Sequence, residues 1–396
     1  MKNIYFDNAA TTRVDERVVK EMMPFFIDNY ANPHAVHSMG QVALEAVENA
    51  RENIAKFFNC ENQEIIFTAG ATEGNNIIIQ GVINHFKNDK VHVICSAIEH
   101  PAVLETVKEM KSPSASSGFS KGVEIDFVPV DEDGVIKLDK LKGLIKDNTV
   151  LVSIMYANNE VGSIAPQAEV GELVKEINKK RSKLPLYFHT DAVQAVNYLD
   201  CNVAKLNCDF LTMSGHKING PKGIGAMFVR KGVKVDPISF GGHQEFNLRP
   251  GTVNVSGVVG LAKSIELIQT EGKVNYQKVK KIKDKLVKEL NKIENIRINC
   301  DLDNSLPNIV NVSFLKAEGE SILMMLDMEG IAISTGSACS FGSLEPSHVL
   351  SAMGRKPEWS HGSIRISLSK FNSEIEVDVF IKHLGGIIEK LRKMAP

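Results

Sequence analysis

The chain contains 396 residues, of which 43% are hydrophobic, and has a formal net charge of -2 at pH 7. A chain of this length usually folds around more than one hydrophobic core, so we expect two domains. The small net charge gives no electrostatic reason to expect nucleic acid or an acidic membrane surface as a partner, and no uninterrupted apolar run is long enough to span a bilayer.

The N-terminus has no apolar signal core, so the sequence favours a cytoplasmic protein that acts on small molecules. The six cysteines, at positions 60, 95, 201, 208, 300 and 339, form no Cys-x-x-Cys pair. They are too widely scattered for a disulfide framework or a zinc knuckle, and we expect no bound metal.

Up to residue 256, short apolar runs alternate with amphipathic stretches. We expect strands at 5–7, 65–68, 91–96, 123–130, 150–155, 186–191, 210–213 and 225–229, and helices at 18–26, 41–58, 77–86, 138–145 and 170–177 and directly after His100. This order predicts an α/β fold with a mostly parallel sheet and helices on both faces. The Ser- and Gly-rich stretch 111–122 is expected to be a flexible loop.

Beyond residue 256 the pattern changes. A nearly continuous helical pattern at 258–293 is expected to link the domains, and it is followed by strands at 308–314 and 363–368 and helices at 320–329 and 375–394. We therefore expect a large cofactor-binding domain at 15–256 and a smaller α/β domain formed by 1–14 and 257–396.

Polar groups follow four of the predicted strands. They are Thr72, His100, Asp191 with Gln194, and Ser214-Gly215-His216-Lys217. In open α/β sheets, binding sites collect at such strand ends. Pyridoxal phosphate needs a lysine for its aldehyde, a carboxylate for its ring nitrogen, a flat group over the ring and donors around its phosphate, and these four strand ends supply them in turn.

Each of these residues also has a purely structural interpretation. Lys217 alone would usually be a solvated loop lysine, and as a Schiff-base lysine it must lose its proton by burial. The turn that contains Ala71 and Thr72 could be a helix cap without a ligand, although free N–H groups at a helix start favour an anion. Asp191 could be a surface turn residue, but the strand before it is apolar.

Three motifs together carry a resemblance to a known family. They are Ser214-Gly215-His216-Lys217, Asp191-Ala192-Val193-Gln194 and Ala71-Thr72-Glu73. With them, the chain resembles nearly end to end the cysteine desulfurases of the pyridoxal-phosphate-dependent class V aminotransferase family. The resemblance implies the fold of type I aminotransferases and a conversion of L-cysteine to L-alanine, with sulfur passed to an enzyme cysteine for iron–sulfur cluster or thio-cofactor biosynthesis.

The same resemblance implies a role for each site residue. Lys217 would be the Schiff-base lysine, Asp191 would hold the ring nitrogen, Gln194 would bond the ring hydroxyl oxygen, and His100 would stack on the ring and move protons. Ser214 and His216 would join Ala71 and Thr72 at the phosphate, and Asn158 would lie near the ring. Thr252 would reach the phosphate of a partner subunit, which implies a homodimer.

The sulfur-accepting residue would be Cys339, in the Gly- and Ser-rich loop 334–343 that resembles the family's long-loop subgroup. An exposed cysteine on its own is a weak signal. Arg365, in an otherwise apolar strand, is expected to pair with a carboxylate, and the resemblance assigns it the substrate carboxylate together with Asn32. The end of the chain at Pro396 leaves docking to an iron–sulfur scaffold, as the sulfur acceptor, open.

Three alternatives remain open from the sequence. The first is another aminotransferase or lyase on the same cofactor, which would need no thiol at position 339. The second is a selenocysteine lyase, which shares most cofactor residues. The third is a metal-binding or sulfur-carrier protein that uses its cysteines and eleven histidines without an organic cofactor.

Overall fold

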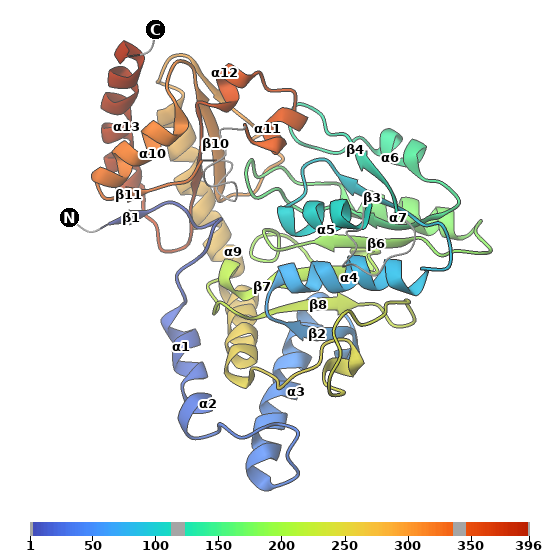
Figure 1. The fold of residues 1–396 in the computed structure, drawn as a ribbon. Helices are drawn as coiled ribbons and strands as arrows, with labels where there is room; N and C mark the ends of the chain where they lie inside the picture. Colours follow the sequence, from blue (N-terminus) through green and yellow to red (C-terminus); the bar gives the residue numbers. More distant parts are fainter. Residues whose placement is uncertain (1–2, 112–122, 336–345, 395–396) are drawn as a thin grey trace.

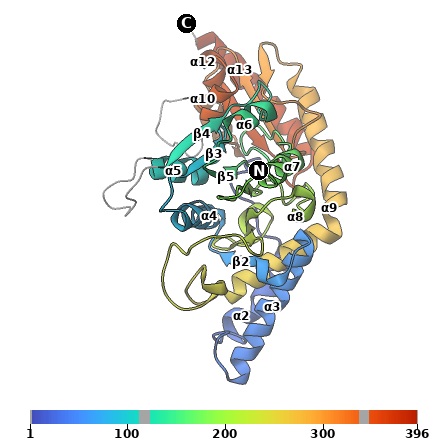
Figure 2. The ribbon, with the colours of Figure 1, turned by 90° about the vertical axis from the view of Figure 1, so that its right-hand side faces the viewer.

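The computed structural model describes residues 3–111, 123–335 and 346–394. A large sheet and a smaller one are joined by the long helix α9 (Val255–Leu290), which runs along one side of the molecule (Figures 1 and 2). The predicted loop at 111–122 lies outside the described residues except for Lys111. Within the described ranges, no helix is both long and apolar enough to cross a membrane.

The large sheet has seven strands in the order β2-β8-β7-β6-β5-β3-β4. Their bounds are β2 Ile65–Thr68, β3 His92–Ser96, β4 Glu124–Val128, β5 Thr149–Ser153, β6 Tyr187–Asp191, β7 Phe210–Ser214 and β8 Gly225–Val229. Neighbours from β4 to β7 pair in parallel, whereas β8 is antiparallel to both β7 and β2. The predicted mostly parallel sheet is confirmed, and β2 ends at the same edge as β3, β5, β6 and β7.

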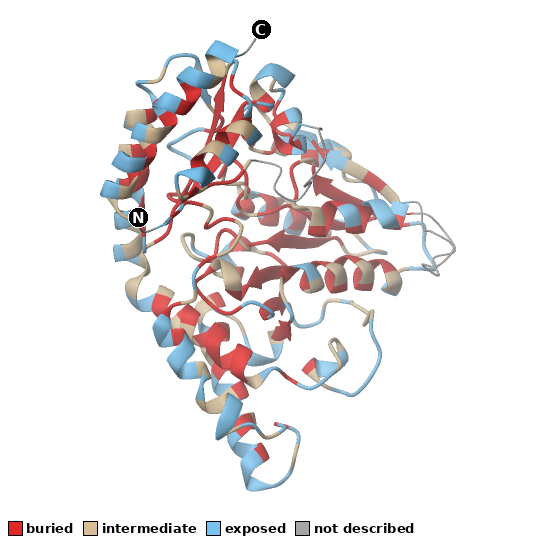
Figure 3. Cartoon of the chain, turned by 60° about the vertical axis from the view of Figure 1, so that its left-hand side comes forward, coloured by how far each residue is buried: buried red, intermediate tan, exposed pale blue. Residues whose placement is uncertain are grey.

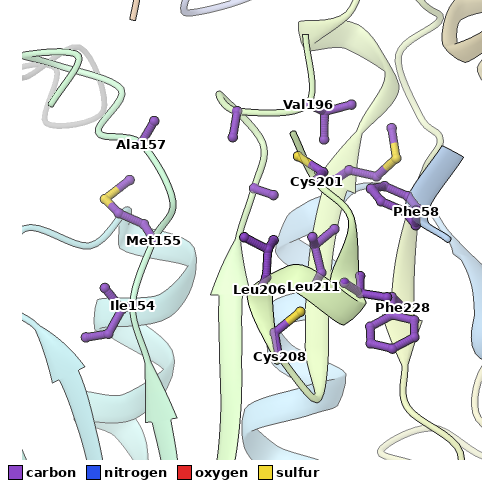
Figure 4. Packing of buried hydrophobic residues seen from close by; sticks show 14 of the residues in the cluster. Phe58, Ile154, Met155, Ala157, Val196, Cys201, Leu206, Cys208, Leu211 and Phe228 are labelled. Carbon is purple, nitrogen blue, oxygen red and sulfur yellow. The ribbon is translucent and has the colours of Figure 1, made fainter. Parts of the chain in front are cut away.

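Helices cover both faces of this sheet. They are α3 Ser38–Phe58, α4 Ala71–His85, α5 Pro101–Lys111, α6 Leu138–Leu144, α7 Gln167–Asn178 and α8 Val203–Leu206. Successive strand residues alternate between two cores: Val93 packs with α4 and α5, and Ile94 with α3 and α7. Figure 4 shows part of the second core, with Phe58 of α3, Leu211 of β7 and Phe228 of β8.

The smaller sheet has the order β12-β10-β9, and a separate strand pair joins β1 to β11. The elements of this unit are β1 Ile4–Tyr5, β9 Ile296–Ile298, β10 Ile309–Phe314, α10 Gly319–Met328, β11 Ile331–Ala332, α11 His348–Ala352, α12 Pro357–Ser360, β12 Ser363–Ser367 and α13 Glu374–Met394. Strands β10 and β12 are buried beneath α10 and α13, whose outer faces are exposed (Figure 3).

Helix α9 contributes to both units. Val258, Leu261 and Ile265 pack in the core of the large sheet, whereas Ile282 and Leu286 pack with the smaller sheet. Residues 269–278 between these two groups are half-buried or exposed. The helix therefore passes from one core to the other in its middle, while the predicted domain boundary after residue 256 stays a prediction.

Two predicted helices differ from the structure by more than their end residues. The helix predicted at 18–26 is divided into α1 (Glu16–Met22) and α2 (Pro24–Ile27), because Pro24 has no backbone N–H to continue the first helix. Helix α4 begins at Ala71 instead of residue 77. Its first turns lack the apolar period because they lie against β7, where a Cβ on Gly74 would be 3.0 Å from Thr212.

Candidate active site

A cavity of about 1430 Å³ opens at the edge where β2, β3, β5, β6 and β7 end. The predicted residues that line it from these strand ends are Thr72, His100, Asp191, Ser214, His216 and Lys217. Ala71, Gln194 and Arg365 also line it. Because Arg365 belongs to β12 of the smaller unit, the cavity lies between the two units.

Lys217 lies at the end of the short 3-10 turn Gly215–Lys217, directly after β7. Its amine donates to the backbone carbonyl of Ala10 at 2.7 Å and to that of Ala9. The N-terminal segment therefore lies beside the amine, although it is more than 200 residues away in sequence. Half-burial and carbonyl contacts keep this amine on the cavity wall, where an aldehyde can reach it.

Asp191 ends β6 and is 5% exposed. One carboxylate oxygen, Oδ2, accepts from Asn75 Nδ2 at 2.8 Å, and the other accepts from the backbone N–H of Val193 at 3.0 Å. Two donors to an anion stabilise its charged form. Gln194 donates to the carbonyl of Ala9 at 3.1 Å, so the segment that contacts Lys217 also contacts the turn after Asp191.

His100 precedes α5, and its Nδ1 accepts from the backbone N–H of Ala102 at 3.1 Å. Burial holds the pKa of His100 below its ordinary value, against the opposite pull of Asp191. The imidazole is therefore neutral at pH 7 and able to accept a proton. Its neighbour Glu99 is fully buried, and burial raises the pKa of Glu99 to about 8.

The start of α4 provides the anion-binding end of the cavity. Thr72 lies in its first turn, where backbone N–H groups have no intrahelical acceptor and the helix dipole favours negative charge. A Cβ on Gly225, at the start of β8, would lie only 2.8 Å from the Cα of Gly70, so glycine at position 225 allows β8 to approach the turn before α4. His216 bonds Thr11 Oγ1 at 3.2 Å, and burial lowers the pKa of His216 to about 4.

Arg365 is 3% exposed and already has a carboxylate partner in the structure. Its Nη2 donates to Asp7 Oδ1 at 2.9 Å, and its Nη1 donates to the carbonyl of Asn159 at 3.0 Å. Its Nε is buried and has no hydrogen-bond partner among the described residues. The predicted pairing with a carboxylate is therefore present within the chain, and Asp7 holds the position expected for a substrate carboxylate.

Glu160 also lines the cavity, and the sequence did not single it out. It is 5% exposed, and burial raises the pKa of Glu160 to about 7. Its Oε2 accepts from the Ser347 hydroxyl at 2.5 Å. The only sequence signal for Glu160 and Glu99 is that each follows an apolar strand within a few residues.

Three predicted site residues within the described part of the chain, Asn158, Asn32 and Thr252, do not line the cavity. Asn158 is buried. Its Nδ2 donates to the carbonyl of Ile98, and its Oδ1 accepts from the backbone N–H groups of Glu160 and Val161. Asn32 and Thr252 are exposed on segments outside the cavity. Cys339 lies outside the described residues. The roles of these four residues stay predictions.

The residues of the cavity fit pyridoxal phosphate by their chemistry. The N–H groups at the start of α4 and the hydroxyls of Thr72 and Ser214 suit a phosphate. The Asp191 carboxylate, which accepts two hydrogen bonds, suits a protonated ring nitrogen, and the Lys217 amine suits the aldehyde. Among the described residues, no three His, Cys, Asp or Glu side chains are grouped as a metal site would require.

Comparisons with known proteins identify the family of the chain. The aminotransferase class-V family model matches residues 4–380. The chain is 43% identical over 395 residues to the cysteine desulfurase IscS of Methanosarcina thermophila, covering 100% of this chain and 94% of that protein. It is 42% identical over 397 residues to a cysteine desulfurase of a Nostoc species, covering 100% and 95%.

Solved structures show the same architecture. A NifS-like protein superposes with a TM-score of 0.89 at 41% identity, covering 98% of this chain and 100% of that one. A structure described as SspA in complex with cysteine has a TM-score of 0.79 at 34% identity, covering 93% and 100%. The chain belongs to the aminotransferase class-V family of pyridoxal-phosphate enzymes.

Proposed function

We propose that this chain is a cysteine desulfurase, which converts L-cysteine to L-alanine and transfers the sulfur to Cys339. The observation that carries the proposal is that Lys217, Asp191 and Arg365 line one cavity. They supply an amine for the aldehyde, an anion for the ring nitrogen and a guanidinium for an amino-acid carboxylate. The cysteine desulfurase names of the relatives and the cysteine complex of SspA support L-cysteine as the amino acid.

Bound pyridoxal phosphate supplies an electron-withdrawing ring that stabilises negative charge next to the substrate α-carbon. Around it, Arg365 binds the substrate carboxylate in place of Asp7 and thereby fixes the orientation of the amino acid. The Lys217 amine and the neutral His100 imidazole accept and return protons at the substrate. Asp191 keeps the proton on the ring nitrogen through its carboxylate.

The sulfur step belongs to Cys339. Its thiolate attacks the substrate sulfur, an S–S bond forms, and the Cβ–S bond breaks with its electron pair left on the substrate carbon. That carbon takes up a proton and becomes the methyl group of alanine. The oxidation of sulfur to the persulfide is thereby balanced by the reduction of the substrate β-carbon. The described chain supports this assignment, since Ser334 pairs with Arg365 and Pro346 lines the cavity on either side of residues 336–345.

The test compares Cys339→Ala with wild type and with Cys60→Ala, which changes a half-buried cysteine that lies away from the cavity. We expect Cys339→Ala to bind the cofactor and cysteine normally but to release neither alanine nor sulfide. Mass spectrometry of wild type and of Cys60→Ala after cysteine addition should find one extra sulfur on Cys339. Alanine release by Cys339→Ala at the wild-type rate would support another lyase or an aminotransferase instead.

The proposed active form is a homodimer. Apolar side chains are exposed on α2 and on the loop to α3, including Phe26 at 57% and Val36 at 95%, and this arm extends away from the body of the chain (Figure 1). Thr252 is exposed but is absent from its own cavity wall. A second subunit would cover the apolar arm and place Thr252 at the neighbouring phosphate site.

Mixed dimers test this arrangement. Lys217→Ala and Thr252→Ala subunits are each expected to be impaired alone, whereas a mixture should recover activity if each site takes its lysine and its Thr252 from different subunits. A monomer in analytical ultracentrifugation would exclude the arrangement.

The acceptor of the persulfide sulfur is proposed to be a protein, with an iron–sulfur scaffold as one candidate. The cysteines among the described residues are all free, and free thiols persist best in a reducing compartment, which supports the cytoplasm as the location.

A further inference from the structure

A chain of buried hydrogen bonds runs behind Asp191, across the strands of the large sheet. Asn75 Nδ2 is 2.8 Å from Asp191 Oδ2, and Asn75 Oδ1 is 2.6 Å from the Thr212 hydroxyl. Thr212 Oγ1 lies 3.5 Å from His189 Nε2, and His189 Nδ1 lies 2.8 Å from the Ser153 hydroxyl. Except for Asp191 at 5%, these residues are 0% exposed.

The strand register explains why these side chains meet. His189 and Asp191 are two residues apart on β6, so they point to the same face of the sheet. In the parallel ladders, Ser153 of β5 pairs with His189, and Thr212 of β7 pairs with Asp191. Asn75 comes from the second turn of α4, which packs on this face.

The hydrogen bonds can all point in one direction. Burial lowers the pKa of His189 to about 3, so the ring is neutral and carries one proton. With that proton on Nε2, Ser153 donates to His189, His189 to Thr212, Thr212 to Asn75, and Asn75 to Asp191. A rotation of the Asn75 amide by 180° would break this order. It would place the amide oxygen against the Asp191 carboxylate and the NH₂ group against the hydrogen of the Thr212 hydroxyl.

We propose that Asn75 is a positioning residue for Asp191, and that Thr212 and His189 lock the Asn75 amide with its NH₂ group toward the carboxylate. In this arrangement the Asp191 carboxylate is held in one orientation at the cavity, where it favours a cofactor with a protonated ring nitrogen. The inference rests on the proposed pyridoxal phosphate site. The preference for a protonated ring nitrogen then depends on Asn75, Thr212 and His189, which act through Asp191 and do not contact the ring.

A matched control lies on the same strand. Thr190 is also 0% exposed, but it points to the opposite face of β6, and its hydroxyl has no hydrogen-bond partner within the described residues. Thr190→Val and Thr212→Val both replace a buried hydroxyl by a methyl group of nearly the same size. Only Thr212→Val breaks the hydrogen-bond chain, and it keeps the methyl group that lies against Gly74.

The test measures the affinity of the full chain, prepared without cofactor, for two compounds. One is pyridoxal phosphate, and the other is its 1-deaza analogue, in which C–H replaces the ring nitrogen. The ratio of the two dissociation constants reports the contribution of Asp191, because the analogue cannot carry the ring proton. A purely structural defect would weaken both compounds equally and leave the ratio unchanged.

We expect Asn75→Ala to lower the preference for pyridoxal phosphate about tenfold, because it removes the charge-assisted hydrogen bond to Asp191. Thr212→Val should lower the preference about two- to tenfold, because it removes the hydroxyl that orients this bond. Thr190→Val should keep the wild-type preference. Thr212→Val also serves if Asn75→Ala does not fold, since it removes no packing atoms beyond one oxygen.

Asp191→Ala distinguishes a failure of the proposed cofactor site from a failure of the positioning role of Asn75. If it leaves the preference unchanged, the proposed cofactor site itself is wrong, and the positioning role falls with it. If Asp191→Ala abolishes the preference but Asn75→Ala or Thr212→Val retains it, only the positioning role is overturned.

Discussion

The pairing of Arg365 with Asp7 makes a quantitative prediction about substrate binding. In the structure, Nη2 contacts Asp7, Nη1 contacts the Asn159 carbonyl, and Nε has no partner among the described residues. A substrate carboxylate that replaces Asp7 gains the Nη2 bond and can also satisfy Nε. Lysine cannot present two parallel N–H donors, so Arg365→Lys keeps the charge but loses one of these bonds.

A hydrogen bond to a charged group contributes about 1.5–3 kcal/mol. Since about 1.4 kcal/mol corresponds to a factor of ten in binding, Arg365→Lys should raise the KM for cysteine about ten- to a hundredfold. Asp7→Asn should act in the opposite direction and lower KM, because it removes the anion that competes with substrate for Nη2. The affinity for pyridoxal phosphate should change in neither variant.

Steady-state kinetics of alanine formation and a separate cofactor titration measure these effects. Arg355→Lys is the matched control. The Arg355 side chain is equally buried and its Nε also has no hydrogen-bond partner among the described residues, but Arg355 lies outside the cavity. An unchanged KM in Arg365→Lys, or an equal rise in Arg355→Lys, would refute the assignment of Arg365 to the substrate carboxylate.

Three further predictions concern the cofactor lysine, a buried ion pair and a buried acid. Lys217→Ala should fold but fail to develop the visible absorption of covalently attached cofactor, and borohydride reduction followed by peptide mapping of wild type should label Lys217 and no other lysine. Glu245→Ala should lower the free energy of unfolding by about 3–5 kcal/mol in urea denaturation of the cofactor-free chain, because the buried Arg51 guanidinium loses its buried carboxylate at 2.8 Å and keeps only the half-exposed carboxylate of Glu48 at 3.2 Å. Arg51→Met added to it should recover part of the loss, and a wild-type midpoint in the single variant would contradict the reasoning. Burial raises the pKa of Glu99 from its ordinary 4.5 to about 8, so the folded chain keeps a proton that the unfolded chain releases. The stability of wild type relative to Glu99→Gln should therefore be highest below pH 4.5 and fall as the pH rises through 8. A pH-independent difference between the two urea midpoints would count against this expectation.

The sequence predicted the large sheet well because most of its strands are buried on both faces and are continuous apolar runs, whereas the edge strand β4 is partly exposed. The polar residues that follow the strands led us to expect Thr72, His100, Asp191 and Lys217 at one edge of the sheet. All four line the cavity there, while their roles stay predictions. The short strands β9 and β11 were missed, since three and two residues show no period.

Residues whose role depends on distant partners could not be predicted. Asn75 is 116 residues from Asp191 in sequence, and nothing in its local pattern indicates that its amide meets a carboxylate. The burial that shifts the pKa values of Glu99 and Glu160 arises only when strands, helices and the smaller unit have packed. Likewise, the contact of Asp7 with Arg365 follows from topology and not from any motif.

The contact between Asp7 and Arg365 spans 358 positions and has a consequence for synthesis of the chain. The N-terminal strand β1 pairs with β11, so both its backbone and the Asp7 carboxylate lack their partners until the ribosome has produced almost the entire protein. Meanwhile, the seven strands of the large sheet can already assemble, because the last of them ends at Val229. The carboxylate pocket is thus completed last, and a nascent chain that stops before β12 has most of the groups predicted for the cofactor but none of the Arg365 contacts needed to hold an amino acid.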